Sequence, residues 1–259
     1  MPKLDEIIIT KAITETYLKD LMDNLELDVV IAGAGPAGMC CAKYIAEKGH
    51  KVAIFERRLS IGGGIWGGGM MFNKVVVQDQ AKKIIDDFEI KNQEYQKGYY
   101  VADAVEMATK MAAKVIDAGA KIFNLISIED VMYRKDRITG VVINWSAVEM
   151  AKLHIDPMTV RARVVIDGTG HECSICRVVE EKMKLKLNTT TGRIEGERSM
   201  WADIGENILL ETTKEVVPGL FVVGMAANAV SGGPRMGPIF GGMLLSGKKA
   251  ADLIIKQLE

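Results

Sequence analysis

Apolar and polar positions follow one another along the chain in an order that predicts a parallel sheet flanked by helices. A largely apolar run at residues 28–32 precedes apolar positions at helical spacing over residues 36–48, and a second largely apolar run occupies residues 52–56. A strand–helix–strand unit has this pattern and a length of about 30 residues. Residues 11–25 also carry apolar side chains at helical spacing, and Thr10 is the expected N-cap of that helix.

The rest of the chain predicts further helices and strands. They are helices at 79–90, 102–120 and 240–259, two or three strands within 121–145, and strands at 158–167 and 220–223 that lead into glycine-rich turns. No internal repeat and no linker interrupts this order, so we expect one domain over residues 1–259. The predicted fold class is α/β. It is a Rossmann-like dinucleotide-binding fold of the glutathione reductase-like, FAD/NAD-binding type, with an N-terminal helix and an inserted β-segment that forms an additional small β-sheet.

Three glycines mark a dinucleotide site in the first strand–helix–strand unit. Gly33, Gly35 and Gly38 form a G-x-G-x-x-G pattern directly after the first strand. They allow the tight turn, the approach of the backbone to a pyrophosphate and the packing of the helix on the strand, respectively. Glu56 ends the second strand, where a carboxylate binds both hydroxyls of an adenosine ribose. This combination predicts a ligand that contains ADP.

The late strand at residues 220–223 argues against a flavin. Enzymes that bind FAD with this type of glycine turn usually carry an aspartate after such a strand, and its carboxylate holds the ribitol. Met225 occupies that position here, and a thioether is a poor substitute for a carboxylate as an acceptor. The sequence therefore keeps the adenosine half of the site and lacks a partner for the flavin half.

Composition and charge argue against nucleic-acid-binding and membrane proteins. The chain has 259 residues and a net charge of −1, so it lacks the basic excess that nucleic-acid binding requires. No apolar run reaches the roughly 18 residues of a membrane span, and the N-terminus lacks the features of a signal peptide, so we expect a cytoplasmic protein without membrane or nucleic-acid partners. The four cysteines are expected to be reduced in that compartment.

Candidate metal ligands are few, because the chain contains only three histidines. His154 and Asp156 are two positions apart and share a face of an extended segment, and His171 follows a strand in the stretch DGTGHE. Two imidazoles and a carboxylate are the ligands of non-haem Fe(II) sites with open positions. A competing site would combine His171 with Cys173 and Cys176.

Arg235 is a candidate for binding an anionic group of a substrate. It lies among glycines and prolines in the stretch SGGPRMGPIFGGM, at the entry to the last helix. An arginine on a rigid loop suits the bidentate binding of a small carboxylate or a phosphate. Its alternative role is structural, as a cap of backbone carbonyls.

Together these segments resemble the thiamine thiazole synthase family, which makes the ADP-thiazole precursor of thiamine. The resemblance covers nearly the whole chain and rests on GAGPAG, FERR, GGGIWGGGMMF, HIDP, DGTGH and RMGPIFGGMLLSGKKAA. It implies an enzyme that takes NAD, glycine and sulfur, releases nicotinamide and forms ADP-5-ethyl-4-methylthiazole-2-carboxylate. An enzyme of this kind shares only the ADP half of its ligand with flavoproteins, in agreement with Met225.

The residue at position 154 distinguishes two branches of that family. Eukaryotic members have a cysteine there, which gives up its own sulfur and allows a single turnover. His154 cannot donate sulfur, so the resemblance implies the archaeal-type branch, which uses free sulfide with bound Fe(II) and turns over repeatedly. By this similarity Asp156 and His171 are the iron ligands, contributed by neighbouring subunits of a homo-octamer. His154 lines the same pocket and is a candidate for proton transfer.

The resemblance also assigns the substrate contacts. Arg235 is expected to bind the glycine carboxylate, and Met225 is expected to line the pocket near the second glycine-rich loop. The expected contacts of the ADP portion are Gly35, Pro36, Glu56, Arg57, Gly63 and the strand around Ser127. Three alternatives stay open at this stage: a flavin-dependent oxidoreductase, a ribose-phosphate isomerase and a non-catalytic NAD-binding module.

Overall fold

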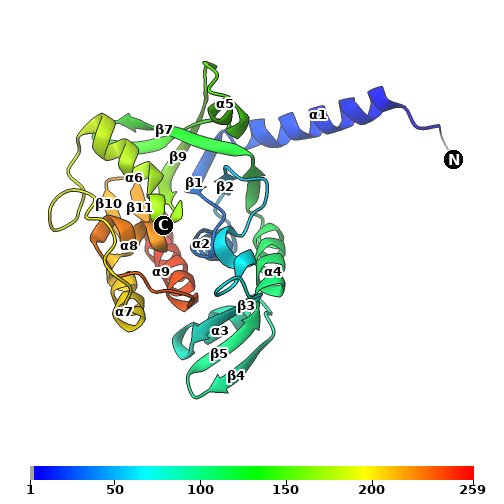
Figure 1. The fold of residues 1–259 in the computed structure, drawn as a ribbon. Helices are drawn as coiled ribbons and strands as arrows, with labels where there is room; N and C mark the ends of the chain where they lie inside the picture. The colour runs from blue at the N-terminus through cyan, green and yellow to red at the C-terminus, as the bar shows by residue number, and fades with distance from the viewer. Residues whose placement is uncertain (1–2) are drawn as a thin grey trace.

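A five-stranded parallel sheet forms the centre of the protein, whose computed structural model describes residues 3–259 (Figure 1). The strand order is β11 (Leu220–Val222), β9 (Met158–Asp167), β1 (Glu26–Ala32), β2 (Val52–Glu56) and β6 (Lys121–Asn124). Strand β10 (Glu215–Val217) adds to one edge in the antiparallel direction. Ile31 of β1 is in register with Ile54 on one side and Ile166 on the other, so the three strands end together.

Both faces of this sheet are covered, as the largely apolar runs predict. Val29 and Ile31 point to one face, and Val30 and Ala32 point to the other. The helices on the first face are α2 (Pro36–Ala46), α3 (Asp79–Asp87), α4 (Ala104–Asp117) and α9 (Gly241–Leu258). The second face carries the hairpin β7 (Ile126–Arg134) and β8 (Arg137–Trp145) with the short helices α6 (Ser174–Val178) and α8 (Met225–Ser231).

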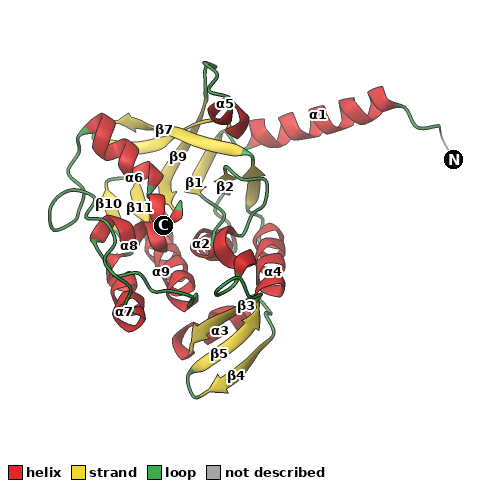
Figure 2. Ribbon diagram, in the orientation of Figure 1, coloured by secondary structure: helices red, strands yellow, loops and turns green. Residues whose placement is uncertain are grey.

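A separate antiparallel sheet confirms the expected additional small β-sheet. Its strand order is β3 (Lys74–Gln78), β5 (Tyr99–Asp103) and β4 (Asn92–Gln96). Figure 2 shows this sheet at the opposite end of the molecule from the β7–β8 hairpin. Val75 and Val77 join it to the main core beneath α3 and α9.

Helix α1 (Glu6–Asp23) projects away from the body of the molecule (Figure 1). Its N-cap is Asp5, whose side chain accepts hydrogen bonds from the backbone of Ile7 and Ile8. The prediction of Thr10 as the cap was therefore wrong: the helix begins one turn earlier, and the Thr10 hydroxyl donates to the carbonyl of Glu6. The buried side chain of α1 is Leu21, whereas Ile7, Ile8 and Ile13 are exposed. An apolar helix surface of this kind is typical of a contact with another chain.

The remaining elements lie in the connections between the strands already described. They are the helices α5 (Ser146–Met150) and α7 (Ala202–Thr212), the 3-10 turns η1 (Gly63–Gly67) and η2 (Gly170–Glu172), and the π-helical turn η3 (Val179–Met183). Sequence periodicity did not predict α7 or α8. Within residues 3–259 no helix combines the length and the apolar character needed to cross a membrane.

Gly38 lies where α2 packs on the end of β1, and its replacement is expected to destabilise the fold. A Cβ atom at this position would lie 2.3 Å from the carbonyl oxygen of Gly33, which is backbone and cannot move aside. Gly38→Ala should cost about 1–3 kcal/mol of unfolding free energy through overpacking. Calorimetry should show a Tm several degrees lower than that of the wild type.

Gly67→Ala is the matched control for this measurement. No atom lies within 4 Å of a Cβ built at Gly67, and its φ lies outside the left-handed region. Its Tm should stay at the wild-type value. An equal fall in both variants would contradict the packing argument.

Candidate active site

A cavity of about 580 Å³ opens at the carboxyl ends of β1, β2, β9 and β11. Ligands of open parallel sheets bind at this edge, where the connections leave the strands in different directions. The cavity has the size of a pocket for a small ligand or cofactor. It extends from the turn after β1 to the loop before α9.

The glycine turn after β1 forms the floor of this cavity. Gly33 has a φ of +95°, and a Cβ there would lie 2.7 Å from the carbonyl oxygen of Gly168, so the turns after β1 and β9 approach through glycine. Gly35 is the N-cap of α2 and makes no side-chain capping bond. A Cβ at Gly35 would meet no atom within 4 Å, so its missing side chain leaves open space at the N-terminus of α2. A phosphate fits such a position because the helix N-terminus presents free N–H groups and positive potential.

Glu56 closes one end of the cavity and is almost fully buried. Its Oε2 accepts a hydrogen bond of 2.9 Å from the backbone of Ala34, and its Oε1 accepts one of 2.9 Å from Arg58. The carboxylate is thus fixed by the chain on both sides. Each oxygen keeps a second lone pair that can accept from a ligand hydroxyl.

Arg57 and Glu172 form an ion pair at the mouth of the cavity. The Nη2 and Oε1 atoms are 2.7 Å apart, and both side chains are about half exposed. The guanidinium lowers the pKa of Glu172, and the carboxylate in turn raises the pKa of Arg57. Because the pair is exposed, its energetic contribution is small. A ligand can therefore displace it at little cost.

Ser127 and Glu149 also line the cavity. The Ser127 hydroxyl is 3.0 Å from that of Ser146 and donates to Glu149 Oε2 at 3.2 Å. Ser127 itself is buried, so its hydroxyl holds helix α5 against β7. Sequence reasoning selected Ser127 and missed Glu149, which lines the same cavity.

His171 is positioned by the turn that follows β9. The buried carboxylate of Asp167 accepts hydrogen bonds from the backbone and hydroxyl of Thr169 and from the backbone of Cys176. These bonds fix the turn on which the imidazole stands. The Nδ1 atom of His171 lies 2.7 Å from Oε2 of Glu197, and Oε1 of Glu197 accepts from the amide of Asn228. Nδ1 is therefore occupied within the chain.

Arg235 lies on the loop between α8 and α9 and lines the cavity. The backbone holds this loop on both sides: Arg235 donates to the carbonyl of Arg198, and Trp201 donates to the carbonyl of Arg235. Within residues 3–259 no carboxylate lies within ion-pairing distance of the guanidinium. In the part of the chain that the structure describes, the arginine side chains that donate to backbone carbonyls are those of Arg134, Arg137, Arg163 and Arg177. The structural alternative for Arg235, a cap of backbone carbonyls, therefore has no hydrogen bond to support it among these residues.

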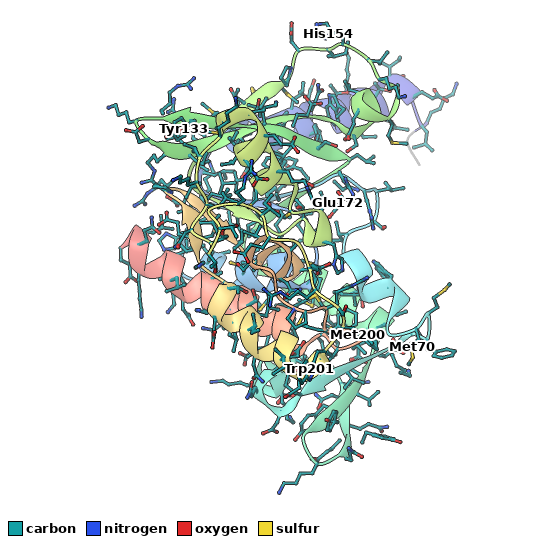
Figure 3. The ribbon with its side chains drawn as sticks, turned by 60° about the vertical axis from the view of Figure 1, so that its left-hand side comes forward. Met70, Tyr133, His154, Glu172, Met200 and Trp201 are labelled. Atoms are coloured by element: carbon teal, nitrogen blue, oxygen red, sulfur yellow. The ribbon has the colours of Figure 1, made fainter. Side chains whose placement is uncertain are left out.

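His154 and Asp156 lie outside the cavity. Both are exposed on the loop between α5 and β9. Figure 3 shows His154 at one end of the molecule, far above Glu172 at the cavity mouth. Within one chain, the histidine–aspartate segment and His171 are therefore not brought together.

The competing metal site is not formed. Among residues 3–259, no group of three or more histidine, cysteine or carboxylate side chains is arranged to hold a metal ion. Cys173 and Cys176 are fully buried. Burial raises the pKa of the Cys173 thiol to about 12 and that of Cys176 well above its ordinary value. Metal ligation requires the thiolate, so the raised pKa of each thiol disfavours both cysteines as metal ligands.

The cavity collects most of the residues that the sequence singled out. They are Gly33, Gly35, Pro36, Glu56, Arg57, Gly63, Ser127, His171, Met225 and Arg235. Gly38 lies beneath the glycine turn, in the packing role predicted for it. Sequence reasoning missed Glu172 and Glu197, whose partners are 115 and 26 residues away in the sequence. No local pattern marks such contacts.

The sequence of this chain is similar to those of a known protein family. The sequence model of the Thi4 family matches residues 10–240. A thiamine thiazole synthase from Methanothermobacter thermautotrophicus is 60% identical over 257 residues, which cover 99% of this chain and all of that protein. The thiamine thiazole synthase of Pyrococcus furiosus is 56% identical and covers 98% of this chain and 99% of its own length.

Solved structures agree with these relatives. The crystal structure of Thermovibrio ammonificans THI4 has a TM-score of 0.97 and 47% identity, with 99% of each chain covered. A geranylgeranyl bacteriochlorophyll reductase-like protein from Thermoplasma acidophilum has a TM-score of 0.59 at 15% identity, covers 90% of this chain and 79% of its own, and shares the fold alone. The comparisons thus confirm the Rossmann-like fold class, and the named relatives give no support to the flavin-oxidoreductase or isomerase alternatives.

Proposed function

The chain belongs to the Thi4 family, and from this membership we propose that it is a thiamine thiazole synthase that uses NAD, glycine and sulfide with Fe(II). Its product would be ADP-5-ethyl-4-methylthiazole-2-carboxylate, with nicotinamide released. The observation that carries the proposal is one cavity with an adenosine end at Glu56 and a reacting end at His171 and Arg235. The same cavity holds Met225 where a flavin site needs a carboxylate.

The adenosine end suits NAD. Glu56 would accept from the two hydroxyls of the adenosine ribose, and its negative charge would repel a 2′-phosphate. The pyrophosphate would lie over Gly35 at the N-terminus of α2. Arg57, released from Glu172, and the backbone around Gly63 and Ser127 would complete the contacts with the ADP portion.

Arg235 would hold glycine at the reacting end. Its guanidinium forms a planar fork that matches a carboxylate with two parallel hydrogen bonds. The backbone pairing of its loop with Arg198 keeps this fork in place. The amino group of glycine would then point toward the opened ribose, which lowers the entropic cost of their condensation.

The metal donors fit Fe(II) only when two chains are combined. His171 offers its Nε2 atom beside the cavity, but Asp156 lies on the distant α5–β9 loop. Leu153 and Ile155 of that loop are exposed at 58% and 54% of their surface, and Met150 at the end of α5 is exposed at 83%, which favours burial of this region against another copy. We propose that Asp156 and His154 of one subunit enter the cavity of its neighbour, within the octamer that the family resemblance implies.

The sulfur would come from outside the protein. Cys40, Cys41, Cys173 and Cys176 are all buried, and burial raises the pKa of each thiol. A protonated, inaccessible thiol is a poor nucleophile, so none is suited to donate sulfur. His154 at the position of the sulfur-donating cysteine would leave the enzyme intact after each reaction. The protein is thus proposed to be a true catalyst.

The roles of the side chains follow from these positions. Asp156 and His171 would hold Fe(II), which would lower the pKa of sulfide and keep the nucleophile near the carbon chain. Arg235 holds the glycine carboxylate and so fixes the orientation of the condensed substrate. An imidazole nitrogen of His154 can accept or return a proton during the tautomeric steps.

Replacing Arg235 tests the glycine site. Arg235→Gln should raise the KM for glycine by roughly 10–100-fold, because a charge-assisted bidentate contact is replaced by a single neutral hydrogen bond. NAD affinity, measured by calorimetry without glycine, should stay at the wild-type value. Arg134→Gln, at the exposed end of the β7–β8 hairpin, is the matched control. An unchanged KM in Arg235→Gln would remove the proposed glycine site.

A further inference from the structure

The contacts of His171 point to a residue that no sequence pattern selected. We propose that Glu197 is a positioning residue that fixes His171 in the tautomer with Nδ1 protonated, so that the lone pair of Nε2 faces the metal. This inference rests on the proposed role of His171 as an iron ligand. It adds a residue whose effect on the metal passes entirely through the imidazole.

The partner of Nδ1 is the basis for inferring which nitrogen carries the proton. Oε2 of Glu197 lies 2.7 Å from Nδ1 of His171. A carboxylate accepts hydrogen bonds, so in the inferred arrangement Nδ1 is the donor. A neutral imidazole with a proton on Nδ1 has its lone pair on Nε2, which is the form that binds a metal.

Glu197 is itself held in place. Its side chain is 16% exposed, against 51% for His171. The fully buried Asn228 of α8 donates from Nδ2 to Oε1 of Glu197 at 3.1 Å, and the same amide group also contacts the carbonyl oxygens of Gly233 and Pro234 at 3.2 Å. One oxygen of Glu197 is thus committed to Asn228, which leaves the other for His171.

The backbone around Glu197 links the segments that hold His171 and Arg235. Residues 195–198 pair with the segment after α8: Glu195 and Gly196 donate to the carbonyls of Val230 and Ala229, and Arg198 donates to Gly233. Arg235 donates back to the carbonyl of Arg198 at 3.1 Å. Segment 195–198 therefore carries the side chain that orients His171 and the carbonyl that positions Arg235.

Glu197→Gln separates orientation from packing, because the amide has the shape of the carboxylate. Asn228 Nδ2 is a donor, so it selects the orientation in which the new amide oxygen faces Asn228 and the amide NH₂ faces His171. The NH₂ group would donate to Nδ1, and the proton of a neutral imidazole would move to Nε2. That tautomer has no lone pair for the metal.

The first readout needs no metal and no activity. Long-range ¹H–¹⁵N spectra of the metal-free, full-length protein at about pH 8, where an ordinary imidazole is neutral, report the tautomer of each histidine. The chain has three histidines, so His171→Ala assigns the signal by its loss. The wild type should show protonated Nδ1 at His171, and Glu197→Gln should show protonated Nε2.

The second readout is anaerobic titration of the same proteins with Fe(II). Glu197→Gln should weaken Fe(II) binding by about 10–100-fold, the usual loss when the partner of a ligating histidine is removed. Glu195→Gln is the matched control, since it makes the same change in the same segment while its side chain faces Thr191. It should leave both the tautomer and the affinity unchanged.

The possible outcomes separate the two proposals. Loss of Fe(II) binding in His171→Ala together with wild-type tautomer and affinity in Glu197→Gln would overturn the role of Glu197 and leave the iron site standing. Wild-type Fe(II) binding in His171→Ala would overturn the iron site and this inference with it. A changed His171 tautomer and weaker Fe(II) binding in Glu197→Gln, with neither change in Glu195→Gln, would establish Glu197 as the positioning residue.

Discussion

Asp156→Ala is expected to abolish thiazole formation while leaving NAD binding intact. The proposed iron site has two protein ligands, so removal of the only carboxylate should weaken Fe(II) binding by at least about 100-fold. NAD should bind as before, because Asp156 is proposed to contribute a metal ligand at the reacting end of the neighbour's cavity and none of the contacts with the ADP portion. Metal content after anaerobic purification and the product measured by mass spectrometry are the two readouts.

Asp136→Ala is the control for this loss of charge. Asp136 is an exposed aspartate in the turn of the β7–β8 hairpin and contacts the hydroxyl of Tyr133. Its removal should leave iron and product at wild-type levels. Sustained thiazole formation by Asp156→Ala would show that this carboxylate is not an iron ligand.

Mixing two inactive variants is expected to restore activity. If each site takes Asp156 from one subunit and His171 from its neighbour, Asp156→Ala and His171→Ala are each inactive alone. In oligomers assembled from equal amounts of both, about a quarter of the sites should receive two intact ligands. Turnover per subunit should then recover to about that fraction of the wild-type rate.

The assembly step supplies the internal control. Variants that are purified separately and mixed under conditions that prevent subunit exchange should remain inactive, whereas co-expressed or refolded mixtures should regain turnover. An inactive co-assembled mixture would mean that Asp156 and His171 of the same chain form the site. The separation of these two residues within one chain would then require a large movement of the α5–β9 loop.

The first strand–helix–strand unit could be predicted because its signals are local. Apolar runs define β1 and β2, helical spacing defines α2, and the positions of Gly33 and Glu56 follow from the ends of those strands. Short helices were harder to predict from the sequence. Helix α8 has seven residues, which is less than two full periods, and it was read as part of a glycine-rich loop.

The reacting end of the site shows where sequence reasoning stops. His154, Asp156 and His171 could be selected by residue type, but their arrangement in space depends on the long β9 strand between them and on the contact between subunits. No pattern in the sequence marked Glu197, because its proposed role depends on its contacts with His171 and Asn228. Contacts of this kind come from tertiary structure rather than from any local pattern.

The most direct test of the proposed function is a mass spectrum of one anaerobic reaction. The purified protein would be incubated with Fe(II), NAD, glycine and sulfide, and the small molecules would be analysed after denaturation. We predict an ADP-linked thiazole carboxylate in molar excess over the protein, with nicotinamide released and no product when sulfide is left out. Unchanged NAD, together with FAD released from the denatured protein, would contradict the synthase and identify the cavity as a flavin site.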